Sequence, residues 1–231
     1  MKKAVISWSG GKDSALALFF CLQSGHYEIV GLLTNVNAHY GRVSMHGVRT
    51  ELIEAQARAI GLPMLPLEFP GDVSMEHYSI LMNQRLVELK TQGITHVIYG
   101  DIFLEDLRQF REQQLSEVGL QGVFPLWNQN TTTVLAGFIE SGFKAVMVCI
   151  NENRLPESWA GRELDATVLV DLPPSVDPCG ENGEYHSFVY DGPIFKNPVS
   201  FHKGETVRRS YEPASQWNTQ FIFQDIHADE S

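Results

Sequence analysis

Hydrophobic positions in the first 150 residues alternate between short continuous apolar runs and longer segments with helical spacing. The apolar runs predict buried strands at residues 4–8, 28–34, 65–69, 95–100 and 145–150, with a short extended segment at 123–127. The helical spacing predicts helices at residues 15–20, 49–60, 75–92, 104–118 and 131–142. Strand–helix alternation is typical of an α/β fold built on a parallel, doubly wound sheet. Within it, Pro66 favours an edge position for the 65–69 strand.

The pattern changes after Ile150, where prolines become frequent and helical periodicity fades. Short β-like runs take its place at residues 185–190, 199–202, 206–211 and 220–226. We therefore expect a smaller α+β domain at the C-terminal end. Our division is 1–135 for the first domain and 136–231 for the second, with the boundary anywhere between 120 and 155.

Composition places the chain among ordinary globular proteins. Its 231 residues carry a net charge of −11, from 17 basic and 28 acidic side chains, which disfavours a nucleic-acid partner. Cys21, Cys149 and Cys179 form no Cys-x-x-Cys pair. The first apolar run is interrupted too soon for a signal peptide, and no stretch is long enough to span a membrane. We expect a cytoplasmic protein with reduced thiols and no membrane partner.

The most informative segment is Ser9-Gly10-Gly11-Lys12-Asp13-Ser14, placed between the first strand and the first helix. A glycine turn at a helix N-terminus binds anions, because the first-turn amides lack partners within the helix. The serine hydroxyls and the lysine ammonium add donors for phosphate oxygens. The spacing is not that of a Walker A loop. The alternative is a solvated Ser/Gly turn that merely caps the helix.

This arrangement resembles the PP-loop of the ATP pyrophosphatases, which split ATP between its α and β phosphates. The resemblance implies a PP-loop, HUP-like nucleotide-binding domain that takes ATP with Mg²⁺. It implies that Ser9–Ser14 holds the departing pyrophosphate, with Lys12 and Asp13 also catalytic and Asp13 placed to orient the loop or hold the metal.

Three further segments should join the same cleft, because ligands of open α/β sheets bind beyond the carboxyl ends of the strands. Thr34 ends the second expected strand, where backbone groups can read an adenine edge. His46 and Arg49 lead into the helix at 49–60, although a loop hydrogen bond and a solvated helix face are the alternatives. Gly100 ends the strand at 95–100 and permits a ligand to approach the backbone closely. Asp101 presents a carboxylate at this strand end, or caps the helix that follows.

Charged residues at helical spacing follow this segment. They favour a salt-bridged surface over a binding site. They are Glu105, Asp106, Arg108 and Arg111.

The second informative segment is the loop at residues 177–186. Its proline and two glycines describe a tightly shaped turn that carries Glu181 and Glu184, three positions apart. A hairpin connection with solvated acids is the alternative. No base accompanies Cys179 in the sequence, so a structural role is favoured for this thiol over a nucleophilic one.

Together, Ser-Gly-Gly-Lys-Asp-Ser, Met-His-Gly-Val-Arg, Gly-Asp-Ile and Gly-Glu-Asn-Gly-Glu-Tyr-His before Asp-Gly-Pro resemble the diphthine–ammonia ligase family over residues 3 to 212. The resemblance implies ATP-dependent amidation of a diphthine carboxylate on elongation factor 2, with AMP and pyrophosphate as products. The acceptor or ammonia site is implied at Glu181, Asn182, Gly183 and Glu184. The motif reads Glu-Asn-Gly-Glu where members usually have Glu-Gly-Gly-Glu, and longer eukaryotic relatives continue beyond this chain. Both departures resemble the short prokaryotic branch.

The mechanism expected from these residues is carboxylate activation. The carboxylate attacks the α-phosphate of ATP, pyrophosphate leaves into the glycine loop, and ammonia then displaces AMP. Glu181 and Glu184 would attract ammonium and accept its proton. The alternatives are a PP-loop enzyme acting on another small-molecule or tRNA acceptor, and an ATP-binding sensor without turnover. A homo-oligomer is compatible with the sequence.

Overall fold

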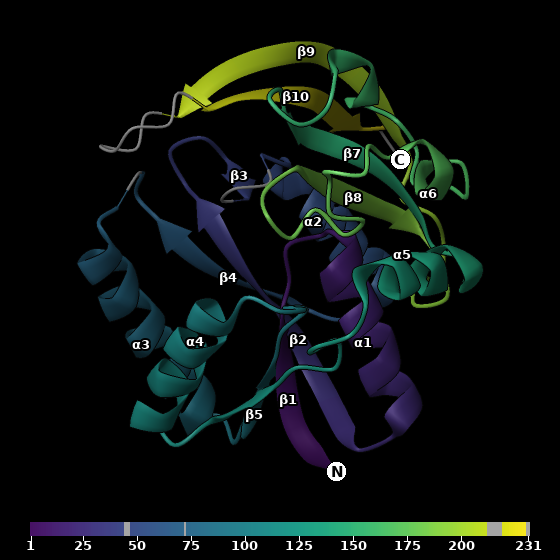
Figure 1. The fold of residues 1–231 in the computed structure, drawn as a ribbon. Helices are drawn as coiled ribbons and strands as arrows, with labels where there is room; N and C mark the ends of the chain where they lie inside the picture. The colour runs from purple at the N-terminus through teal and green to yellow at the C-terminus, as the bar shows by residue number, and fades with distance from the viewer. Residues whose placement is uncertain (44–46, 72, 212–218, 230–231) are drawn as a thin grey trace.

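The computed structural model describes residues 1–43, 47–71, 73–211 and 219–229, and it contains two β-sheets (Figure 1). The first sheet holds β1 (Lys2–Ser7), β2 (Tyr27–Asn37), β3 (Arg42–Val43), β4 (Met64–Phe69), β5 (His96–Ile98) and β6 (Gln121–Val123). Strands β4, β2, β1, β5 and β6 pair in parallel in that order, and β3 adds an antiparallel pair to β2. The prediction of an α/β fold with a doubly wound parallel sheet is confirmed. Strand β4 pairs with β2 on one side, in agreement with the edge position expected from Pro66.

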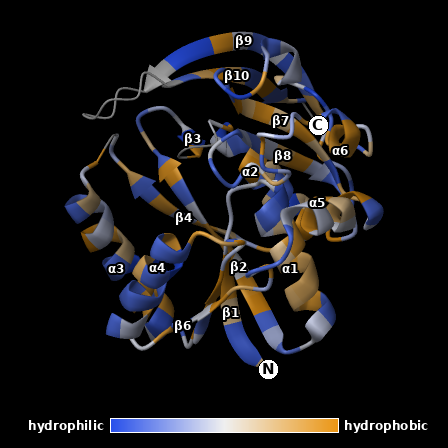
Figure 2. Ribbon diagram, viewed as in Figure 1, coloured by the Kyte–Doolittle hydropathy of each residue, from blue (hydrophilic) through white to orange (hydrophobic). Residues whose placement is uncertain are grey.

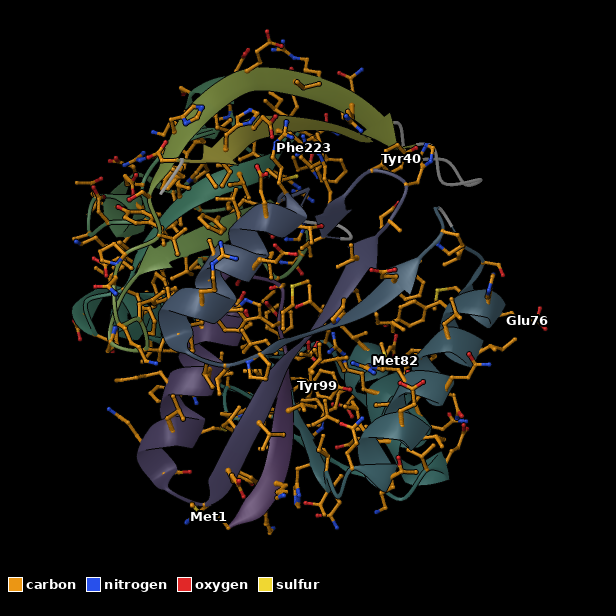
Figure 3. The ribbon with its side chains drawn as sticks, turned by 180° about the vertical axis from the view of Figure 1, so that it is seen from behind. Met1, Tyr40, Glu76, Met82, Tyr99 and Phe223 are labelled. Atoms are coloured by element: carbon orange, nitrogen blue, oxygen red, sulfur yellow. The ribbon has the colours of Figure 1, made fainter. Side chains whose placement is uncertain are left out.

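Helices cover both faces of the parallel sheet. They are α1 (Lys12–Ser24), α2 (Thr50–Ile60), α3 (Met75–Thr91) and α4 (Glu105–Glu117). Successive strand residues point to opposite faces. Thus Leu32 packs in the hydrophobic cluster that contains α1 and α2, whereas Leu33 packs in the one that contains α3 and α4. Figure 3 shows Tyr99 and Met82 among the side chains on the α3 and α4 side of the sheet.

The second sheet contains β7 (Lys144–Asn151), β8 (Tyr185–Asp191), β9 (Phe201–Tyr211) and β10 (Thr219–Ala228). Their order is β8-β7-β10-β9, and every pair is antiparallel. Helix α5 (Thr131–Glu140) precedes this sheet, and η1 (Glu157–Trp159) and α6 (Val168–Asp171) lie between β7 and β8.

Two sequence expectations need correction here. The strand at 145–150 closes the regular alternation, yet β7 belongs to the antiparallel sheet. The apolar run indicates burial on both faces of the strand. A central strand of an antiparallel sheet can be buried in this way as well as a parallel one. The end of the run at 199–202 and the run at 206–211 belong to one strand, β9, which begins at Phe201. The polar residues between them lie on an exposed strand that needs no apolar pattern.

The two sheets share a hydrophobic cluster that includes Leu16 of α1, Phe188 of β8 and Ile222 of β10. Figure 2 shows hydrophobic colour along the middle of β1 and β2 and hydrophilic colour over α4. The division of the chain at residue 135 stays a prediction. Within the described residues, no helix combines the length and apolar character that crossing a membrane requires.

Candidate functional site

The Ser9–Ser14 loop lies at the point where the strand order of the parallel sheet reverses. From β1 the chain crosses to β2 on one side, and β5 later pairs on the other side. Gly10 adopts a left-handed backbone with φ 81°, and Gly11 is the extended N-cap of α1. The amide of Ala15 donates to the Gly11 carbonyl at 3.1 Å, so the amides of Asp13 and Ser14 precede the hydrogen-bond ladder of the helix. This is the geometry of an anion site at a switch point.

The serines of the loop stabilise its shape. Ser9 Oγ accepts a hydrogen bond from the Gly11 amide at 3.3 Å and lies 3.4 Å from Ser14 Oγ. Ser14 Oγ donates to the Gly11 carbonyl at 2.9 Å. Both hydroxyls therefore belong to one small network around the N-terminus of α1.

Gln56 of α2 joins the loop to the second sheet, and our sequence analysis missed it. Its Nε2 donates to the carbonyls of Gly10 at 3.0 Å and Val189 at 2.6 Å, and its Oε1 accepts from Trp8 Nε1 at 2.9 Å. The side chain is fully buried. In addition, the Val189 amide donates to the Gly10 carbonyl at 2.9 Å. A glutamine among apolar helix positions was the only available signal.

Gly100 lies against the start of α1, as we expected from its place after β5. A Cβ at this position would lie 2.7 Å from the carbonyl carbon of Asp13 and 2.9 Å from the Ser14 amide nitrogen. Neither backbone atom can move without shifting the helix terminus. Glycine is therefore required for β5 and the loop to approach this closely.

The Lys12 side chain is directed into the protein, and it is only 4% exposed. Its ammonium donates to Asp13 Oδ2 at 2.8 Å and to the Cys179 carbonyl, and it lies 5.1 Å from the centre of the Tyr185 ring. Burial, the largest single effect, opposes the charged form, but the charge and hydrogen bond of Asp13 together with Tyr185 and Cys179 outweigh it and raise the pKa of Lys12 above its ordinary value. In this conformation Lys12 attaches the 177–184 loop to α1 rather than facing an open cleft.

Three carboxylates lie near one another at this point. Asp13 Oδ1 and Asp101 Oδ2 are buried, and neither accepts a hydrogen bond from the described residues. Glu181 Oε2 accepts a bond from the Ile102 amide at 3.4 Å. Burial first, and then the charge of Asp13, raises the pKa of Glu181 to about 7. Glu181 therefore changes its charge near neutral pH.

Glu184 has a different environment from Glu181, and its role in the reaction stays a prediction. It is 2% exposed, and its oxygens accept from the amides of Asp177 at 3.0 Å and Asn182 at 2.9 Å, as well as from Asn182 Nδ2 at 3.2 Å. These bonds close the turn in which Gly183 has φ 80°. Glu184 and Asn182 thus shape the loop, and Glu181 is its acid near Asp13.

Cys179 belongs to the same loop and has a structural environment. Its thiol is buried and donates to the Thr131 carbonyl at 3.3 Å, and burial raises its pKa. Thr131 also donates through its hydroxyl to Asp177 at 2.7 Å, so the start of α5 supports the loop.

The remaining candidates from the sequence have separate environments. Thr34 lies within β2, which continues to Asn37, although the pairing of β2 with β1 ends at Leu33. Its hydroxyl is buried without a hydrogen bond to the described residues. Arg49 caps α2 and is engaged by Asp225 of β10, at 2.6 Å and 3.2 Å. His46 lies outside the described residues.

The charged face of α4 is only partly the salt-bridged surface that we predicted. Arg108 pairs with Glu112 at 2.9 Å. Both Arg108 and Arg111, however, lie over aromatic rings, which the helical charge pattern did not indicate.

The described residues contain no group of three His, Cys, Asp or Glu side chains placed to hold a metal ion by themselves. A magnesium ion is usually bound by one or two carboxylates together with substrate phosphates and water. The buried, unpaired Oδ1 of Asp13 beside the anion loop fits that kind of shared site.

Comparison with known proteins gives matches over most of the chain. A model described as diphthamide synthase N-terminal domain matches residues 1–122, and one described as diphthamide synthase C-terminal domain matches residues 130–228. The diphthine–ammonia ligase of Danio rerio is 26% identical over 226 residues, covering 87% of each chain. That of Homo sapiens is 27% identical over 230 residues, covering 87% of this chain and 84% of the human protein.

Two further matches are more limited. The Schizosaccharomyces pombe diphthine–ammonia ligase is 25% identical over 222 residues, and the match covers 87% of this chain but 36% of the yeast protein. Among solved structures, a predicted subunit of tRNA methyltransferase from Methanocaldococcus jannaschii aligns with a TM-score of 0.43 at 16% identity, over 62% of this chain and 77% of that one. A TM-score at this level does not establish a shared fold.

Proposed function

Because the chain belongs to the diphthamide synthase family, with its N- and C-terminal domains matched over residues 1–122 and 130–228, we propose that it is an ATP-dependent carboxylate–ammonia ligase. Its acceptor would be a diphthine-like carboxylate carried by elongation factor 2. A carboxylate oxygen attacks the α-phosphorus of ATP, and the bond to pyrophosphate breaks. Ammonia then attacks the acyl-adenylate carbon, and AMP leaves. The products are the amide, AMP and pyrophosphate.

The observation that carries this proposal is the anion loop at the switch point of the parallel sheet, opposite the 177–184 loop. The Asp13 and Ser14 amides lie at the positive end of α1, where charge grows on the departing pyrophosphate. Gly100 brings the end of β5 to the same point. ATP bound there would have its phosphates beside Asp13, with the acceptor on the Glu181 side.

Asp13 would hold Mg²⁺ together with the phosphates of ATP. Bound there, the ion would neutralise phosphate charge as pyrophosphate leaves. Lys12 would help to hold Asp13 in place for this role, since its ammonium pairs with the Asp13 carboxylate and donates to the Cys179 carbonyl of the 177–184 loop. We propose that it reaches a phosphate only if ATP displaces one of these contacts. Thr34 would lie near the nucleotide base, and Asp101 near the ribose or the phosphates.

Glu181 would accept the proton that ammonia releases as it attacks the acyl-adenylate. A general base is most effective when its pKa is close to the working pH, and the pKa of Glu181 is raised to about 7. Glu184, Asn182 and Gly183 would support that role by shaping the turn.

The test is product analysis with ATP, Mg²⁺, ammonium and elongation factor 2 that carries diphthine. A ligase forms AMP, pyrophosphate and amide in equal amounts, and only when the acceptor is present. Glu181→Gln should reduce amide formation by about a hundredfold or more, as expected for loss of a general base. Glu205→Gln, on the exposed strand β9, is the matched control and should retain full activity. ATP binding without AMP formation would instead indicate a nucleotide sensor.

A further inference from the structure

A continuous stack of rings and guanidinium groups runs along the side of α4 that faces the parallel sheet. The guanidinium of Arg108 lies 4.5 Å from the centre of the Trp127 ring and 4.8 Å from that of Phe124. The Phe124 ring stacks on Tyr99 with centroids 5.5 Å apart. The guanidinium of Arg111 lies 4.2 Å from the Tyr99 ring. We call this series of side chains the α4 stack.

The α4 stack ends at the candidate site. Arg111 Nε lies 3.1 Å from Asp101 Oδ2, and the two side chains are 23% and 12% exposed. Asp101 Oδ2 is buried and accepts no hydrogen bond from the described residues, so this ion pair is its principal restraint. Oδ2 therefore has a cation beside it but no hydrogen-bond donor among the described residues.

The packing around Arg111 favours one orientation. A guanidinium that lies over a buried ring and beside a carboxylate has few alternative positions. Tyr99 is 6% exposed and directly precedes Gly100 and Asp101 in the chain. One ring therefore supports both the cation and the backbone that carries the carboxylate.

We propose that Arg111 is a positioning residue for nucleotide binding: placed over the Tyr99 ring, it holds the Asp101 carboxylate in the orientation that receives ATP at the switch point. The inference rests on the proposed function in one respect, namely that ATP is the ligand of this cleft. Arg111 acts through Asp101 and does not itself contact the nucleotide.

The experiment measures the dissociation constant of ATP in the presence of Mg²⁺ by titration calorimetry, which requires no turnover. Arg111→Met keeps an unbranched side chain and removes the charge. It should weaken ATP binding at least about tenfold, the scale of one charge-assisted hydrogen bond between ATP and a well-oriented Asp101 carboxylate. Arg111→Lys should recover part of the loss, because an ammonium can pair with Asp101 but lacks the fixed planar shape of the guanidinium. Thermal denaturation of each variant shows that it is folded.

Arg108→Met is the matched control. Arg108 lies on the same helix and in the same stack, but its carboxylate partner is Glu112. This variant should bind ATP within about twofold of wild type, the scale of a surface substitution. Equal losses in Arg108→Met and Arg111→Met would mean that the stack is merely structural, and would overturn the inference.

A double-mutant cycle tests the link to Asp101 directly. If Arg111 acts through Asp101, the Arg111→Met/Asp101→Asn double variant binds ATP as Asp101→Asn alone does. Additive losses would overturn the inference. Wild-type protein that binds ATP but forms no AMP would refute the ligase proposal. The double-mutant cycle would still test the role of Arg111, because it measures ATP binding and needs no turnover. Wild-type protein without ATP affinity would refute both.

Discussion

Gln56 provides a sensitive test of how the anion loop is held in place. Gln56→Met retains most of the side-chain volume and removes all polar contacts. Trp8 Nε1 then loses its acceptor, and the Val189 carbonyl loses its 2.6 Å bond, whereas the Gly10 carbonyl keeps the bond from the Val189 amide. Each buried polar group left without a partner costs about 1–3 kcal/mol. With two such groups, we expect the free energy of unfolding to fall by roughly 2–6 kcal/mol.

Urea denaturation followed by tryptophan fluorescence measures this loss, and hydrogen exchange at the Val189 amide localises it. The control is Gln113→Met on the exposed face of α4, which should change the free energy of unfolding by less than about 0.5 kcal/mol. If Gln56→Met lost no more than this control, or if exchange at Val189 were unchanged, Gln56 would not be the tie between the loop and β8.

Three further predictions concern the site and the junction of the two sheets. Gly100→Ala places a Cβ 2.7 Å from the Asp13 carbonyl carbon, so it should displace the start of α1 and weaken ATP binding at least about tenfold; binding unchanged by calorimetry would contradict the close approach. At constant free ammonia, kcat/KM should rise with pH around the Glu181 pKa of about 7, because the base works when ionised, and this step should be absent in Glu181→Gln; the same midpoint in that variant would assign the step to another group. Burial opposes ionisation of Asp225, but hydrogen bonds from Arg49 and Arg42 lower its pKa to about 2, so its stabilising effect is present above the ordinary value of 3.8 and is lost as pH falls toward 2. Asp225→Asn should therefore lower the melting temperature at pH 7, with a difference from wild type that shrinks below pH 4; a constant difference would exclude the ion pair as its cause.

The sequence predicted those parts of the fold that follow from local pattern. Residues 52, 53, 57 and 60 share one apolar face, and Gly61 ends the helix with φ 85°, so α2 was predicted to within a residue. The anion loop was recognisable because a strand, two glycines and a helix start are contiguous. Its place at the switch point then follows from the parallel order of the strands.

Other features depend on contacts between distant segments, which local pattern does not encode. The apolar run of β7 indicates burial, but it does not indicate whether the neighbouring strands are parallel or antiparallel. Arg49 was expected to bind an anionic ligand because it lies at the start of a helix. Its guanidinium instead donates to Asp225, 176 positions away in the sequence. Lys12 and Glu184 have the residue types expected at a site, and local pattern did not show that both are buried and hydrogen-bonded within the protein. Their catalytic roles stay predictions. Gln56 and the α4 stack were missed for the same reason.

Isotope transfer shows whether a carboxylate oxygen attacks the α-phosphorus of ATP. Elongation factor 2 with ¹⁸O in the diphthine carboxylate would be incubated with the protein, ATP, Mg²⁺ and ammonium, and the products analysed by mass spectrometry. We expect one ¹⁸O atom in the phosphate of AMP for each amide formed. Label found in inorganic phosphate, with ADP as the coproduct, or amide formed with unlabelled AMP, would contradict it.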